Sequence, residues 1–189
     1  MAKKNKIAFG KLNLLRNDIL NNKKKIRIGF IGGGPSSFIG YTHRLAARFD
    51  NRFEFKAGIF SKNIKKSKIF GAALGLDKDR CYDSYRKMAL LESKREDGIQ
   101  ALGIMTPSGD HLKIAKPFIE KGIHIICDKP LTSTISDAEI LKKLVDKNKI
   151  IFALTHNYSA YPMLREAKKI VTSGKIGKVN LVNVEYPQG

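Results

Sequence analysis

A glycine-rich turn is the segment whose residue types and spacing point most directly to chemistry. The run Gly32-Gly33-Gly34-Pro35-Ser36-Ser37 follows an apolar stretch and precedes a helical pattern. In that context Gly32 permits a tight turn, and Gly34 lets the backbone approach a pyrophosphate. A helix beginning near Ser36 would point its free N–H groups at that anion. Ser37 stands at the third motif position, where a small hydroxyl still packs closely and can bond a phosphate. The turn predicts a dinucleotide site; the alternative is a turn that only packs a strand on a helix.

The residues after the second apolar run bear on which dinucleotide is bound. NAD-binding sites usually place a carboxylate there for the ribose hydroxyls, but this chain has Phe60-Ser61-Lys62-Asn63. Ser61 and Lys62 could hold a 2′-phosphate, and Lys65 and Lys66 add positive charge nearby. The sequence therefore favours NADP over NAD, although lysine is abundant throughout the chain.

Three further polar segments follow apolar runs. They contain Thr106-Pro107, Asp128-Lys129 and His156. Ligands of open α/β sheets bind beyond the carboxyl ends of the strands, so these residues are candidates for a site. Lys129, with the Asp128 carboxylate beside it, could polarise a carbonyl or assist proton transfer next to a nicotinamide. His156 either contacts a substrate or bonds to backbone.

The elements that must position these residues alternate between short apolar runs and segments of helical period. This alternation is typical of an α/β protein with a doubly wound parallel sheet, here a Rossmann-like NAD(P)-binding domain. Ser108 and the pair Ser136 and Glu139 are predicted to cap helices, and Pro162 suits a first helical turn. The predicted strands are 26–31, 53–60, 100–105, 122–127 and 150–155.

Composition narrows the class of protein. The 189 residues include 36 Lys and Arg against 17 Asp and Glu, for a formal net charge of +19. Residues 1–25 hold eight basic residues and one acidic residue, and we interpret them as a basic flexible arm. No apolar run approaches the roughly 20 residues that span a bilayer, so we expect a cytoplasmic protein and no membrane partner. Cys81 and Cys127 lack metal-ligand spacing and are expected to be buried thiols.

The end of the sequence predicts a second domain. Residues 179–186 alternate apolar and polar side chains imperfectly, which indicates a half-buried strand. We therefore expect a dinucleotide-binding domain over 26–177 and, over 178–189, the first strand of a truncated second domain.

Taken together, residues 26–189 resemble the N-terminal Rossmann part of the Gfo/Idh/MocA oxidoreductases. The matching motifs are the Gly32–Ser37 turn, Thr106-Pro107-Ser108 with His111, Asp128-Lys129-Pro130, and the turn over 173–177. In that family the lysine of a Glu-Lys-Pro motif contacts cofactor and substrate, and Lys129 takes its place. Asp128 replaces the glutamate and is one methylene shorter. The resemblance also implies that Thr106 and Pro107 lie beside the nicotinamide ribose and that His111 is chiefly structural.

The resemblance implies NAD(P)-dependent hydride transfer to or from a hydroxyl carbon of a sugar, cyclitol or polyol. It also implies a homo-oligomer for the full-length form. This chain alone could be inactive, because the family's substrate pocket belongs to the C-terminal domain. Two alternatives stay open: a non-catalytic nucleotide-binding subunit or sensor, and a basic nucleic-acid-binding α/β protein. The second is disfavoured because the lysines are dispersed and no recognition helix is evident.

Overall fold

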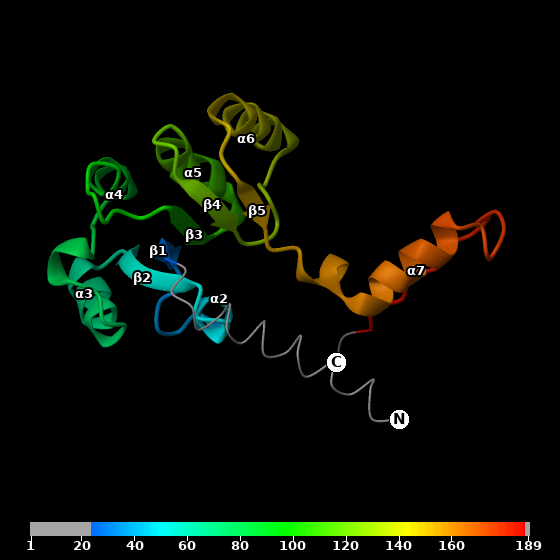
Figure 1. Ribbon diagram of the computed structural model, residues 1–189, viewed down its shortest axis with the longest axis horizontal. Coiled ribbons are helices and arrows are strands. Elements are labelled where there is room, and N and C mark those ends of the chain that lie inside the picture. The colour runs from blue at the N-terminus through cyan, green and yellow to red at the C-terminus, as the bar shows by residue number, and fades with distance from the viewer. Residues whose placement is uncertain (1–23, 188–189) are drawn as a thin grey trace, which may run out of the picture. The chain divides into compact units, whose positions relative to one another are not determined.

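The computed structural model describes residues 24–187, and its core is a five-stranded parallel sheet (Figure 1). The strand order is β2-β1-β3-β4-β5. A parallel bridge between Gly58 and Cys81 extends the pairing outside β2. The α/β fold class is thereby confirmed, with strand boundaries within two residues of those predicted. The strands are β1 Ile26–Gly32, β2 Phe53–Ile59, β3 Ala101–Met105, β4 His124–Cys127 and β5 Phe152–Leu154.

Helices cover both faces of this sheet. Helices α4, α5 and α6 lie on one side of it, and α2 lies on the other (Figure 1). Successive strand residues alternate between two apolar clusters: Leu102 and Ile104 pack with α5 residues such as Phe118, whereas Ala101 and Met105 pack with Ala47 of α2. The sheet is therefore doubly wound. The helices are α2 Phe38–Phe49, α3 Ile64–Ala73, α4 Tyr85–Glu92, α5 His111–Ile119, α6 Ile135–Asn148 and α7 Pro162–Thr172.

The topology places a crevice at the end of β1. The chain proceeds outward from β1 to β2 and then returns to β3 on the other side of β1. Connections on the two sides therefore leave β1 and β3 in opposite directions. Such a switch point is where open α/β sheets bind ligands, beyond the carboxyl ends of the strands.

Helix termini show where local sequence was a good guide and where it was not. Asn63 caps α3 by accepting hydrogen bonds from the Lys65 and Lys66 N–H groups, and Pro162 occupies the first turn of α7. The predicted capping box at Ser136 is wrong, because α6 begins two residues earlier. Thr134 caps it instead, with its Oγ1 accepting from the Asp137 N–H at 3.1 Å.

The chain divides into two units, with the boundary between Thr155 and His156. The second unit contains a short 3-10 turn at Asn157–Ala160 and helix α7. The predicted strand over 179–186 is wrong for this structure: the segment has no regular structure, and Leu181 and Val184 are exposed. A strand needs a neighbouring strand for its backbone hydrogen bonds, and none pairs with this segment among the described residues. The predicted basic arm lies mostly outside the described residues.

Across residues 24–187, none of the helices has the length and apolar character needed to cross a membrane.

Candidate functional site

The glycine turn after β1 has the geometry that its sequence predicted. Gly32 and Gly33 have φ angles of +87° and +65°, a backbone conformation that glycine adopts at low cost. A Cβ atom on Gly32 would also overlap the carbonyl of Met105 in β3. At Gly34 a Cβ would overlap the carbonyl oxygen of Phe60, just after β2. The contact with the Phe60 carbonyl therefore requires a glycine at position 34, whatever ligand approaches the turn.

The same turn packs against the helix that follows it. Ser37 caps α2, with its hydroxyl accepting from the Gly40 N–H at 3.1 Å, and a Cβ on Gly40 would overlap the backbone of Gly33. Arg44, one turn further along α2, donates from its guanidinium to the Gly33 carbonyl and is buried. The sequence analysis missed Gly40, which provides the close contact between helix and turn. The turn at the end of β1 therefore packs against β3, the residue after β2, and α2.

A cavity of about 470 Å³ opens at the carboxyl edge of the sheet, where β1, β2 and β3 end. It brings together four of the predicted cofactor residues: Gly32, Ser61, Lys62 and Thr106. It also contains polar residues that the sequence analysis did not select. These are Asp83, Tyr85, Asp110 and Lys113.

The polar groups of this cavity fit a nucleotide. The hydroxyl oxygen of Thr106 is buried and has no hydrogen-bond partner among the described residues, so a bound hydroxyl or phosphate would satisfy it. Lys62 is exposed at the cavity and forms no ion pair within residues 24–187, whereas Lys113 is paired with Asp110. Asp83 supplies a carboxylate from a segment the sequence analysis did not consider.

The predicted Asp128-Lys129 segment is held from several directions. The Asp128 N–H donates to the Ile104 carbonyl at 2.9 Å, and its Oδ1 accepts from the Thr155 hydroxyl at 3.0 Å. His43 of α2 places Nε2 3.7 Å from the same oxygen. Lys129 itself is exposed, and the peptide bond between it and Pro130 is cis. The structure thus fixes the backbone of this segment and leaves the Lys129 ammonium free to meet a ligand.

Burial sets the ionisation of two groups near this segment. It lowers the pKa of His43 below its ordinary value, against the opposing effect of the Asp128 carboxylate. It raises the pKa of the Cys127 thiol to about 12, with a smaller contribution from the neighbouring Asp128 charge. Both effects favour the neutral form, so at neutral pH His43 is uncharged and Cys127 is a thiol. Cys81 and Cys127 are both buried, as the sequence predicted.

The remaining predicted residues are placed as follows. Pro107 follows Thr106 on the way to α5, and Ser36 lies in the turn closed by the hydrogen bond from the Ser37 N–H to the Gly34 carbonyl. His156 is the first residue of the second unit, where its carbonyl accepts from the Ser159 hydroxyl at 2.7 Å.

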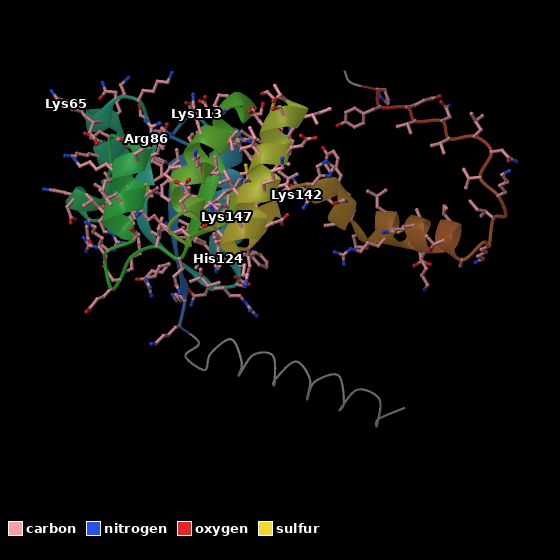
Figure 2. The ribbon with its side chains drawn as sticks, turned by 90° about the horizontal axis from the view of Figure 1, so that it is seen from above. Lys65, Arg86, Lys113, His124, Lys142 and Lys147 are labelled. Carbon is pink, nitrogen blue, oxygen red and sulfur yellow. The ribbon has the colours of Figure 1, made fainter. Side chains whose placement is uncertain are left out.

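The basic side chains are spread over the helices (Figure 2). Lys65 lies on α3, Arg86 on α4, Lys113 on α5, and Lys142 and Lys147 on α6. Two of these five, Lys113 and Lys142, are paired with Asp110 and Asp146 on their own segments. Because these basic side chains lie on four different helices and two of them are paired with carboxylates, they do not form a defined nucleic-acid groove.

These features define the class of protein: a dinucleotide-binding domain with a glycine turn at the switch point of a doubly wound sheet. Residues 26–156 match the model of the Gfo/Idh/MocA oxidoreductases, an oxidoreductase family with an NAD-binding Rossmann fold. The chain belongs to this family.

Individual relatives agree with this assignment. The chain is 38% identical over 167 residues to the uncharacterized oxidoreductase YfiI of Bacillus subtilis, covering 88% of this chain and 42% of that protein. Among solved structures, an oxidoreductase from Sinorhizobium meliloti has 47% identity and a TM-score of 0.75, covering 82% of this chain and 43% of that one. An inositol dehydrogenase homolog from Azotobacter vinelandii, complexed with NADH and myo-inositol, has 37% identity and a TM-score of 0.78, covering 82% and 41%. The chain thus spans less than half the length of these relatives.

Proposed function

We propose that this chain is the cofactor-binding part of an NAD(P)-dependent dehydrogenase that acts on a sugar, cyclitol or polyol. The observation that carries this proposal is the cavity at the switch point, where Gly32, Ser61, Lys62 and the unpartnered Thr106 hydroxyl meet. The related protein from Azotobacter vinelandii was solved as a complex with NADH and myo-inositol, which supports the substrate class.

In this proposal each part of the cavity has a separate role. Ser61 and Lys62, after β2, bind the adenosine ribose and its 2′-phosphate, while the turn from Gly32 to Ser37 takes the pyrophosphate. Thr106 and Pro107, after β3, line the path to the nicotinamide. The residues that directly follow β2 in the sequence include Lys62 and no carboxylate, and pairing of Lys62 with a 2′-phosphate supports NADP over NAD.

Lys129 and His156 are the proposed catalytic residues. The cofactor accepts or delivers the hydride, and the chain must hold the reacting oxygen and accommodate its proton. The Lys129 ammonium can donate a hydrogen bond to that oxygen. We propose that His156, the first residue of the second unit, contacts substrate. Cytoplasmic location and a homo-oligomeric full-length form stay predictions.

The test is a titration of this chain with NADPH and with NADH, followed by nicotinamide fluorescence. We expect saturable binding with NADPH the tighter ligand, and we expect Lys62→Ala to reduce that preference. Lys147→Ala is the matched control, because Lys147 lies on α6 and does not line the cavity. Absence of binding by the folded wild-type chain, or equal losses in both variants, would contradict the assignment. Binding without turnover in the full-length protein would instead favour the non-catalytic nucleotide-binding alternative.

A further inference from the structure

His111 lies buried between the two segments that follow β3 and β4. It is the first residue of α5, and only 1% of its surface is exposed. Its Nε2 lies 2.8 Å from the Thr106 carbonyl oxygen. Its Nδ1 lies 3.1 Å from the carbonyl oxygens of both Pro130 and Leu131. One imidazole ring therefore contacts the backbone on each side of the proposed nicotinamide end of the site.

A second contact joins the same two segments. The hydroxyl groups of Ser108 and Ser133 lie 2.8 Å apart at the surface. The segment from Thr106 to His111 and the segment from Lys129 to Ser133 are thus linked by a buried ring and by an exposed hydroxyl pair. Lys129 precedes Pro130 directly, so the ring acts one residue away from the proposed catalytic lysine.

We propose that His111 is a positioning residue that holds the Lys129 segment against the Thr106 segment and so fixes the nicotinamide end of the cofactor site. This inference rests on the function proposed above. The adenosine ribose is assigned to the end of β2 and the pyrophosphate to the glycine turn. A dinucleotide lying across the switch point must then place its nicotinamide beyond β3 and β4.

The chemistry of the ring explains why histidine suits this position. All the partners of His111 are carbonyl oxygens, which only accept hydrogen bonds. A planar ring with nitrogens on opposite sides reaches both segments: the nitrogen that carries the proton donates to the carbonyl that it faces, and the other nitrogen lies in contact with the second segment. Alanine would remove both ring nitrogens and with them the link between the two segments. Glutamine keeps two amide N–H donors on a flexible side chain and should restore the link in part.

The test compares two ligands on the same chain: NADPH, and adenosine 2′,5′-bisphosphate, which lacks the nicotinamide end. We expect His111→Ala to raise the Kd for NADPH about tenfold, by releasing the Lys129 segment from the Thr106 segment, while the Kd for the bisphosphate is unchanged. His111→Gln should recover part of the NADPH affinity. His124→Ala is the control, because the His124 ring lies at the opposite edge of the sheet, where its Nδ1 accepts from the Ile151 N–H at 3.1 Å.

Rates of amide hydrogen exchange in the same variants test the contact between the two segments in the absence of any ligand. We expect His111→Ala to accelerate amide exchange in residues 129–133 and to leave β1 and β2 protected. Equal loss of affinity for both ligands, or unchanged exchange and unchanged NADPH affinity, would overturn the positioning role. A folded wild-type chain that binds neither ligand would overturn the proposed function and the functional part of this inference. The exchange data would then decide whether His111 links the two segments.

Discussion

The Nε2 atom of His43 lies 3.7 Å from Oδ1 of Asp128, so the helix that follows the glycine turn reaches the segment that carries Lys129. Both side chains are largely shielded from water, with 11% and 16% of their surfaces exposed. The Thr155 hydroxyl donates to the same carboxylate oxygen. The Asp128 carboxylate, which directly follows β4, is therefore contacted by a side chain from α2 and by one from the end of β5. It lies next to the proposed catalytic lysine.

The burial of His43 predicts a pH dependence of the free energy of unfolding. Burial lowers the pKa of His43 in the folded state, so the unfolded chain takes up a proton at His43 at a higher pH than the folded chain does. Stability is then retained above the unfolded pKa of about 6.5 and lost as the pH falls through it. Replacing His43 by glutamine should flatten the fall in the free energy of unfolding below that pH. Urea unfolding at a series of pH values measures it, and parallel curves for the two proteins would refute the prediction.

The packing of α2 on the glycine turn predicts a second effect. Gly40→Ala should destabilise the domain by about 1–3 kcal/mol, because the new methyl group overlaps the backbone of Gly33 and forces the helix away from the turn. Gly109→Ala is the matched control, since its added Cβ would meet only the Ser133 hydroxyl at an ordinary distance of 3.5 Å. Thermal unfolding of both variants provides the comparison. A loss at Gly109 as large as that at Gly40 would show that the overlap is not the cause.

A buried ion pair outside the site predicts a large effect on stability. The Arg80 Nε donates to Glu92 Oε1 at 3.1 Å, and the Tyr82 hydroxyl donates to the same oxygen at 2.7 Å. Removing the carboxylate with Glu92→Ala should cost about 3–5 kcal/mol, because the buried Arg80 guanidinium then keeps only the half-exposed Asp97 carboxylate as an ionic partner.

The exposed pair of Lys142 and Asp146 on α6 is the control for this ion pair. Asp146→Ala should leave the melting temperature nearly unchanged, because water screens the pair. A small change on removing Glu92, measured in the same denaturation experiment, would contradict this prediction and mean that Asp97 alone is a sufficient partner for the Arg80 guanidinium.

The two cysteines are predicted to resist alkylation in the folded protein. Burial raises the pKa of Cys127 to about 12 and also raises that of Cys81, so little thiolate forms at neutral pH, and the thiolate is the reactive form. Iodoacetamide should modify neither thiol in the native chain but both after denaturation, as mass spectrometry would reveal. Rapid labelling of the native protein at Cys127 would show that the end of β4 opens to solvent.

The sequence predicted the sheet well, for a physical reason. Strands such as β1 and β3 are buried on both faces, and this burial demands continuous apolar runs that are visible without any tertiary information. The glycine turn was equally visible, because the positive φ angles of Gly32 and Gly33 restrict the residue type locally.

Features that depend on distant contacts were not predictable in the same way. Asp83 enters the cavity from a segment with no motif of its own, and Gly40 is a glycine because of its contact with Gly33. The contact between His43 and Asp128 joins residues 85 positions apart, beyond any local pattern. The predicted strand over 179–186 was wrong because apolar alternation alone does not supply the partner that a strand requires.

The most direct test of the central claim is to map cofactor contacts on this chain by amide chemical shifts during a titration with NADPH. The account predicts shifts that saturate together at Gly32 to Ser37, Ser61, Lys62, Thr106 and Lys129. It also predicts unchanged shifts at Gln100 and Ile123, which line a separate cavity away from the proposed site. Changes confined to that second cavity, or no saturable change in a folded sample, would contradict the assignment of a dinucleotide site to the carboxyl edge of the sheet.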